Sequence, residues 1–287
     1  MPRVSPRDLA LRSLDQLPPF SPVLNQLMAS LADDGVSFSK LAGVIERDSV
    51  LSGHVLRLVN SALYGRRGTV SSVRAAVSIL GLTKLRNFLL GLSVSKLWAK
   101  VKTPASWSMT RFNNHGVAVA LLADGIVQKA RANYPEGAFV AGLLHDLGRL
   151  MIAISMPAEF DRILAAQEIS RQSIEVCEAE LLELTHSELS AAALARWNLP
   201  EPIRKAVLYH HEPHLDPARN TPGTLPLSQA LAAANQLANA LGHSITPQEG
   251  ALVRPVSDVL AGIGLENSEE EILDSFVTEM QAIQQIQ

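Results

Sequence analysis

Apolar residues along this chain recur three and four positions apart, the spacing that places them on one face of an α-helix. In the first hundred residues this pattern predicts helices at 41–45, 51–62, 73–80 and 85–92. Asp48 and Thr83 stand where they can cap the second and the fourth of these helices. Gly65 and Gly81 follow the second and the third, and Pro104 closes the group.

The helical spacing continues after Pro104. It predicts helices at 106–131, 136–155, 158–169, 173–184, 186–197, 202–211, 225–241 and from 268 onward. No segment alternates apolar and polar residues as a half-buried strand does, and no repeat of fixed period is found. The sequence therefore predicts an all-α fold in three parts, namely residues 1–105, residues 106–245 and a C-terminal helical extension, 246–287.

The composition is that of a globular chain, with 47% hydrophobic and 18% charged residues among 287. Cys177 is the only cysteine, which excludes an intramolecular disulfide and a cysteine-rich zinc module and indicates a reducing compartment. Charged side chains interrupt the first thirty residues, unlike a secretory signal, and the uncharged stretch 220–248 is too polar to cross a bilayer. We expect a cytoplasmic protein without a membrane span.

Charge is unevenly distributed along the chain, although the net charge is only −3. The segment from Ser49 to Ala123 holds ten basic and no acidic residues, whereas Asp124 to Gln287 holds ten basic and 22 acidic ones. A basic surface can attract an anionic partner such as a nucleic acid. Here the basic residues are scattered at helical spacing, without interleaved aromatic residues, so we favour charge complementarity within the fold or across a homodimer over nucleic-acid binding.

The candidate chemistry lies in five histidines on predicted helices, His115, His145, His186, His210 and His211, and in Asp146, which directly follows His145. Imidazole and carboxylate ligands suit first-row divalent ions such as iron, manganese or zinc, and side chains from separate helices can converge inside a bundle. A single buried histidine is more often a hydrogen-bonded core residue. The adjacent pair of His145 and Asp146 favours a metal or a strong polar partner, because both are costly to bury unpaired.

Several stretches resemble a known family. The sequence "GLLHDLGRL" at 142–150 resembles the hallmark of the HD superfamily of metal-dependent phosphohydrolases. The sequences "IERDSVLSGHVLRLVNSALYG" at 45–65 and "VRAAVSILGLTKLRNFLLGLSV" at 73–94 resemble the first portion of the HDOD domain, an HD-related output module of bacterial signalling. Its continuation is similar to "LTHSELSAAALARWNLPEPIRKAVLYHHEP" at 184–213. The resemblance implies an HD-like helical bundle preceded by an HDOD-type helical subdomain.

In the related HD proteins that hydrolyse cyclic dinucleotides, histidines, a His-Asp doublet and a late aspartate hold two metal ions. The resemblance implies that the metal ligands here are His115, His145, Asp146, His186, His210, His211 and Asn235, the last of which stands in place of the late aspartate. It also implies that Glu178 orients one of the ligands from behind. The Gly-Tyr-Pro motif of those phosphodiesterases is missing, since "EPHLDPARN" follows the histidine pair.

The number of ions can be weighed by charge. Two divalent ions held by neutral histidines and by Asp146 alone would carry about +3 in a partly dry cavity, and Asn235 supplies no charge to lower it. A binuclear enzyme needs both ions to generate its nucleophile and to hold the reacting oxygens. We therefore expect one divalent ion, or none, and assign no catalytic residue.

Two classes of function follow. We favour a non-catalytic regulatory module that contacts signalling proteins and keeps the HD-like pocket with one metal. The alternative is a metal-dependent phosphohydrolase acting on a nucleotide or cyclic dinucleotide, which the presence of all five histidines and Asp146 supports. A nucleotide ligand is compatible with either class.

Overall fold

The all-α prediction is confirmed by a computed structural model of the chain, which describes residues 5–29, 42, 43, 45–61, 70–98, 101–250 and 253–284. Within these residues the secondary structure is helical, and the one β-bridge joins Ala132 to Leu225. Four positions of the predicted helices and their ends, Leu41, Val44, Ala62 and Gly65, lie outside the described residues.

The chain divides into two compact units that are not continuous in sequence. One unit comprises Met1–Pro18 and Lys100–Ile272, and the other comprises Pro19–Ala99 and Leu273–Gln287. The first eighteen residues share a unit with the middle of the chain because α1 (Pro6–Arg12) packs on α9 (Leu147–Ser155) and α11 (Ile174–Leu182). The three continuous parts expected from the sequence stay a prediction, since compactness alone does not locate an independently folding domain.

The smaller unit contains α2 (Pro22–Ala29), α4 (Ser49–Val59), α5 (Val73–Leu80) and α6 (Leu82–Leu97). Asp48 caps α4 as predicted, because its side chain accepts hydrogen bonds from the N–H groups of Val50 and Leu51. Thr83 does not cap α6. The chain turns at Gly81 with φ +78°, and α6 begins at the next residue, so Thr83 falls inside the first helical turn.

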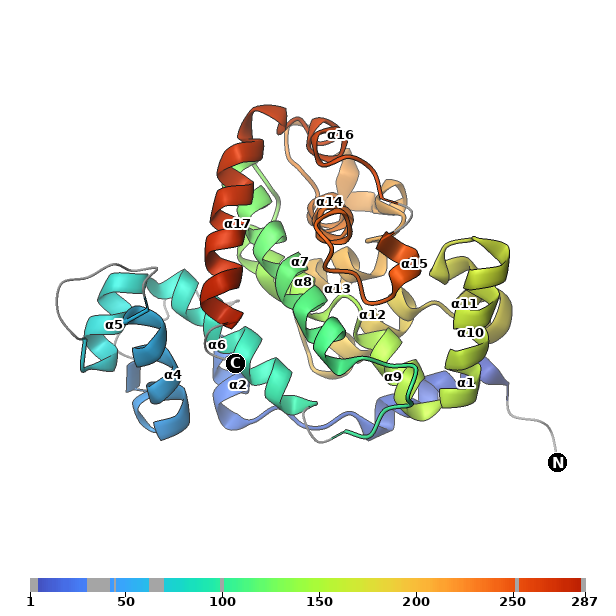
Figure 1. Cartoon of the computed structure of the whole chain (residues 1–287), viewed down its shortest axis with the longest axis horizontal. Helices are drawn as coiled ribbons and strands as arrows, with labels where there is room; N and C mark the ends of the chain where they lie inside the picture. Colours follow the sequence, from blue (N-terminus) through green and yellow to red (C-terminus); the bar gives the residue numbers. More distant parts are fainter. Residues whose placement is uncertain are drawn as a thin grey trace. The chain divides into compact units, whose positions relative to one another are not determined.

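The larger unit is a bundle around α7 (Met109–Lys129), α8 (Ala138–Leu144) and α14 (Leu227–Ala240), which pack on one another. Figure 1 shows α7 and α8 side by side. The remaining helices of this unit are α10 (Pro157–Ser170), α12 (His186–Arg196), α13 (Glu201–Leu208), α15 (Pro247–Gly250) and α16 (Val256–Ala261). The last helix, α17 (Glu269–Gln284), crosses the boundary between the units after Ile272.

Two glycines allow helices of this bundle to approach closely. A Cβ atom at Gly142 would lie 2.6 Å from Ala120 Cα, where α8 packs on α7. A Cβ atom at Gly148 would lie 2.2 Å from the main-chain oxygen of His186, where α9 packs on α12. Both glycines flank the pair of His145 and Asp146, so these two close crossings fix the backbone that carries the candidate chemistry.

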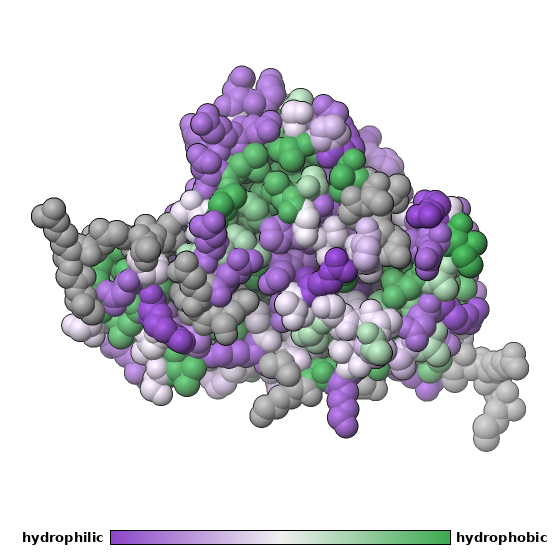
Figure 2. All heavy atoms as spheres, viewed as in Figure 1, coloured by the Kyte–Doolittle hydropathy of each residue, from purple (hydrophilic) through white to green (hydrophobic). Residues whose placement is uncertain are grey.

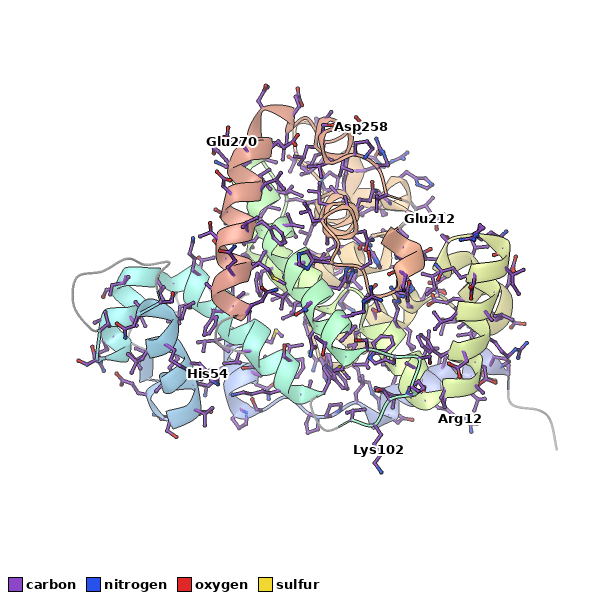
Figure 3. All side chains as sticks on the ribbon, in the orientation of Figure 1. Arg12, His54, Lys102, Glu212, Asp258 and Glu270 are labelled. Atoms are coloured by element: carbon purple, nitrogen blue, oxygen red, sulfur yellow. The ribbon has the colours of Figure 1, made fainter. Side chains whose placement is uncertain are left out.

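One segment, Pro135–Ser155, is long and apolar enough by length and composition to cross a membrane, with a mean hydropathy of 1.4. However, 94% of its most apolar 18-residue window is buried inside the protein, and the segment breaks between α8 and α9. The segment therefore forms part of the hydrophobic core. Figure 2 shows hydrophilic residues over much of the visible surface, with apolar ones among them. Charged side chains such as Lys102, Glu212 and Asp258 are exposed (Figure 3).

Candidate metal centre

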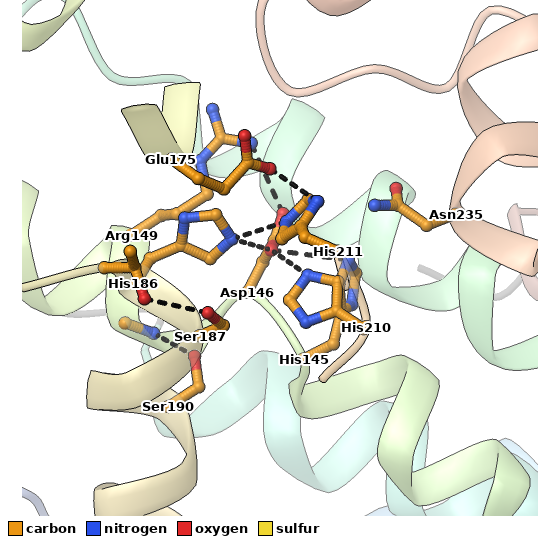
Figure 4. Close-up of polar contacts among 12 residues, drawn as sticks. His145, Asp146, Arg149, Glu175, His186, Ser187, Ser190, His210, His211 and Asn235 are labelled. Atoms are coloured by element: carbon orange, nitrogen blue, oxygen red, sulfur yellow. Dashed lines mark hydrogen bonds and ion pairs between the residues drawn. The ribbon is translucent and has the colours of Figure 1, made fainter. Parts of the chain in front are cut away.

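The five predicted histidines and Asp146 come together in the larger unit. Figure 4 labels Asp146 and four of these histidines, His145, His186, His210 and His211. His115 lies on α7, and His145 and Asp146 lie at the break between α8 and α9. His186 is the first residue of α12, and His210 and His211 lie in the turn after α13. The single helix predicted over 136–155 is therefore two. The break falls at Asp146, and both adjacent side chains reach the cluster, with His145 Nε2 3.4 Å from Asp146 Oδ1.

Three histidines are oriented by main-chain carbonyl groups. The Nδ1 atoms of His115, His145 and His210 lie 2.6, 2.8 and 2.6 Å from the oxygens of His243, Gly142 and Val207. Because a carbonyl only accepts, each Nδ1 donates its hydrogen, and each Nε2 keeps a free lone pair. That tautomer presents Nε2 to an ion.

The other two histidines are oriented by carboxylates. His186 Nδ1 lies 2.7 Å from Glu178 Oε2, which also accepts a hydrogen bond from the His186 main-chain N–H. His211 Nδ1 lies 2.5 Å from Glu175 Oε1. Glu178 thus stands behind a candidate ligand as the resemblance implied, whereas the matching role of Glu175 was not foreseen.

Asp146 lies at the centre of the cluster. Its Oδ1 faces the Nε2 atoms of His145, His186 and His210 at 3.4, 3.2 and 3.6 Å. Its Oδ2 lies 3.5 Å from His115 Nε2. Oδ1 and His210 Nε2 are both buried and have no hydrogen-bond partner, which is a costly arrangement unless another group satisfies them.

The ligand atoms form two groups that share Asp146. One consists of Asp146, His186, His210 and His211, and the other of His115, His145 and Asp146; within each, the ligand atoms lie within 4.8 Å of one another. Both groups are buried except at His211, whose side chain is 26% exposed. Asp146 is the only carboxylate in either group.

The distances between nitrogens fit a metal ion. His115 and His145 face each other with Nε2 atoms 3.2 Å apart, and His186 and His211 do so at 3.0 Å. Two lone pairs at this distance repel unless a cation or proton lies between them. An ion with bonds of about 2.1 Å at angles of about 90–110° holds neighbouring ligand atoms about 3.0–3.4 Å apart. The donors present therefore fit a divalent ion.

Electrostatics keeps the central carboxyl in the form that binds metal. Burial alone would raise the pKa of Asp146, but the facing His145 and His186 hold that pKa well below its usual range. Burial also lowers the pKa values of His115 and His145, so both are neutral near pH 7. His186 differs, because the carboxylates of Glu178 and Asp146 outweigh burial and raise its pKa to about 10.

Asn235 lies on α14 and lines the same cavity as His115, Asp146 and His211. Its amide oxygen accepts a hydrogen bond of 3.4 Å from Asn239. Figure 4 draws it beside the cluster with no polar contact to the histidines. A role for Asn235 as a metal ligand stays a prediction, and its side chain brings no charge to the centre.

A cavity of about 810 Å³ opens beside the ligands, and Arg149, Glu175 and Glu249 line it. Sequence reasoning missed these three residues. Arg149 could have been found, since it stands three positions after Asp146 on one helix and their side chains lie 3.3 Å apart. Nothing in the sequence relates Glu249, a hundred positions further on, to Arg149, with which it forms an ion pair.

These residues change the charge balance that the sequence suggested. Four carboxylates, those of Asp146, Glu175, Glu178 and Glu249, surround the site together with one guanidinium, that of Arg149. With every histidine neutral, as metal binding requires, the formal charge of these groups is −3, so two divalent ions would leave +1 instead of about +3. Net charge alone therefore does not decide between one ion and two.

The remaining histidines are not ligands in either group. His54 pairs with Arg57 on α4, with 2.7 Å between the two nitrogens (Figure 3). The carbonyl oxygen of His243 orients His115. His214 lies in a short 3-10 helix, Pro213–Leu215.

We expect Glu178→Gln to weaken metal binding about 10–100-fold, because glutamine cannot supply the charge that holds and polarises His186. The measurement is the dissociation constant for Zn²⁺ from competition with a chromophoric chelator. Glu180→Gln is the matched control, since Glu180 is exposed on the same helix. Equal affinities of the two variants would contradict a supporting role for Glu178.

The sequence matches the family described as the HDOD domain over residues 17–213. An uncharacterised protein of Treponema pallidum (strain Nichols) is 25% identical over 202 residues, which are 70% of this chain but only 39% of that protein. The chain thus spans well under half the length of this curated relative.

Solved structures share the fold. An HDOD domain protein of unknown function from Geobacter sulfurreducens is 24% identical with a TM-score of 0.76, over 96% of this chain and 98% of its own. A protein of Shewanella amazonensis SB2B, provisionally named a phosphohydrolase, is 23% identical with a TM-score of 0.73, over 97% and 98%. A protein of Marinobacter aquaeolei VT8, provisionally named a signal transduction protein, is 22% identical with a TM-score of 0.74, over 97% and 66%.

At these identities the solved structures establish the fold alone. The family match covers more than half of the chain and includes the stretches in which the resemblance was first found. The chain therefore belongs to the HDOD domain family.

Proposed function

We propose that this protein is a non-catalytic regulatory module whose HD-like half holds one divalent metal ion and which acts by contacting other proteins. The observation that carries the proposal is the single carboxylate, Asp146, shared by both ligand groups. A hydrolytic two-metal centre needs two ions, each held by its own ligands, to generate the nucleophile and to clamp the reacting oxygens, and here both ligand groups depend on the same carboxylate. Asn235, at the edge of the cavity, offers only an amide.

The ion belongs in the group formed by Asp146, His186, His210 and His211. This group offers four ligand atoms, and two of its histidines are backed by Glu178 and Glu175. A divalent ion here would supply a fixed positive charge and join three segments of the bundle. These segments are the break between α8 and α9, which carries Asp146, the start of α12, which carries His186, and the turn after α13, which carries His210 and His211.

Partners are proposed from the family and from the distribution of charge along the chain. As an HDOD domain protein it is expected to meet signalling proteins, and a homodimer would allow the basic segment 49–123 to face acidic residues of a second copy. Nucleic-acid binding is not expected. It would require an affinity that falls steeply with salt concentration.

The second candidate is a metal-dependent phosphohydrolase. The cavity of about 810 Å³ beside the ligands is large enough for a nucleotide, which favours this alternative. Under it, the retained histidines and Asp146 would bind ions that hold a phosphate ester in place. A nucleotide bound without turnover would be compatible with the regulatory module.

Metal content and turnover, measured on the same samples, separate the two functions. We expect about one ion per chain by elemental analysis and hydrolysis of bis(p-nitrophenyl) phosphate no faster than with the Asp146→Ala variant. Metal-dependent turnover that Asp146→Ala abolishes would establish the phosphohydrolase. A folded wild-type protein that takes up no metal when dialysed against Zn²⁺ or Mn²⁺ would remove the metal centre from the proposal.

A further inference from the structure

Arg149 is a buried cation next to the metal ligands. Its side chain is 3% exposed, and one guanidinium nitrogen lies 3.3 Å from Asp146 Oδ2. The same nitrogen forms an ion pair with Glu249 of α15. A buried guanidinium keeps its charge only where carboxylates compensate it, and these two do so. The position of the cation is thus fixed from both sides.

The two oxygens of Asp146 face different neighbours. Oδ1 is directed toward His145, His186 and His210 and has no hydrogen-bond partner. Oδ2 faces His115 and already accepts from Arg149. A carboxylate that bridges two ions uses one oxygen for each. Here one oxygen is available to an ion, while a guanidinium engages the other.

The surroundings of the two ligand groups differ in charge. Behind the four-ligand group stand Glu175 and Glu178. The Nδ1 atoms of His115 and His145 face neutral main-chain carbonyls, and the nearby carboxylate of Glu249 is paired with Arg149. Asp146 Oδ2, which faces His115, also contacts the guanidinium of Arg149. An ion bound between His115 and His145 would therefore meet a like charge in a buried environment. The structure thus favours an ion in the first group and opposes one in the second.

We propose that Arg149 takes the place of a second metal ion and thereby limits this centre to one ion, held by Asp146, His186, His210 and His211. This inference rests on the proposed metal centre and names the residue that sets its stoichiometry. Arg149 is here a positioning residue that acts through Asp146. Removing its charge would free Asp146 Oδ2 to join His115 and His145 around a second ion, and would leave the carboxylate of Glu249 uncompensated in the same cavity.

The test is the Mn²⁺ content of four purified full-length proteins after equilibration with Mn²⁺ and removal of unbound ion. We expect about one ion per chain in the wild type and in Arg149→Lys, which keeps the charge. We expect about two in Arg149→Met, which keeps the apolar stem without the charge. The double variant Arg149→Met/Glu249→Gln is expected to return to about one, because the uncompensated negative charge of Glu249 that attracts the second ion is then missing.

The outcomes separate this inference from the metal centre itself. One ion in both the wild type and a folded Arg149→Met would overturn the role of Arg149 and leave the centre intact. Two ions in the wild type would also overturn it, and no ion in the wild type would overturn the centre together with the inference. If Arg149→Met does not fold, the electron paramagnetic resonance spectrum of the wild type with excess Mn²⁺ decides. Isolated Mn²⁺ is expected, and an exchange-coupled pair would contradict the proposal.

Discussion

Replacing Asp146 with asparagine is expected to reduce bound metal from about one ion per chain to background. Asp146 belongs to both ligand groups and is the only carboxylate in either, so no other ligand can take over its charge. The amide keeps the size of the side chain but binds divalent ions far more weakly, and we expect the affinity to fall more than about 100-fold, beyond the loss caused by a supporting residue. Elemental analysis of protein purified without a metal-binding tag measures this.

The same variant should lose the stabilisation that the ion confers. An ion present at a hundred times its dissociation constant stabilises the folded state by about 2.7 kcal/mol. Chelation should therefore lower the Tm of the wild type but leave that of Asp146→Asn unchanged. Glu212→Gln is the matched control, since Glu212 is an exposed carboxylate that lines the cavity outside both groups. If Asp146→Asn kept its metal, the ion would have to bind elsewhere in the chain.

Gly148→Ala is expected to destabilise the larger unit by about 3 kcal/mol or more, which is the upper end of the usual cost of overpacking. The added Cβ would lie 2.2 Å from the main-chain oxygen of His186, and a main-chain atom cannot rotate away as a flexible side chain can. Helices α9 and α12 would have to separate. Because His186 is the first residue of α12, metal affinity should fall together with stability.

The control for this variant is Gly125→Ala on α7. A Cβ atom there would meet only Ile272 Cγ2, at 3.8 Å, which is an ordinary contact. Since alanine is favoured over glycine inside a helix by about 1 kcal/mol, this variant should be as stable as the wild type or slightly more stable. Urea denaturation of both variants tests the pair. If the Gly148→Ala and Gly125→Ala variants were equally stable, α9 and α12 would not approach as closely at Gly148 as the structure shows.

Much of this protein could be predicted from sequence because the causes are local. Helical spacing gave the fold class, and Asp48 was found as a cap because a cap acts on the next three residues. The candidate ligands were singled out because histidine and aspartate are costly to bury among apolar residues without a partner. The motifs around them then indicated the family, which the match over 17–213 confirmed.

Local reasoning was less successful where the chain bends or restarts. The pattern over 136–155 is continuous in apolar character, so it did not reveal the break between α8 and α9 at His145 and Asp146. Thr83 has the chemistry of a cap but not its position, because the turn at Gly81 lets α6 begin two residues earlier than a cap at Thr83 allows. Side-chain type alone does not specify these main-chain angles.

The sequence by itself determined the helical class, the family and the residue types able to bind a metal, since these follow from composition, periodicity and motif. Only the tertiary structure decided which atoms meet. It divided the ligands into two groups around Asp146 and brought Glu249 from α15 to Arg149. Charge interactions depend on distances between residues remote in sequence, and those distances exist only after the helices have packed. For that reason the sequence alone led us to infer the number of ions from Asn235, which supplies no charge. From the folded chain we infer it from Arg149, which contacts Asp146.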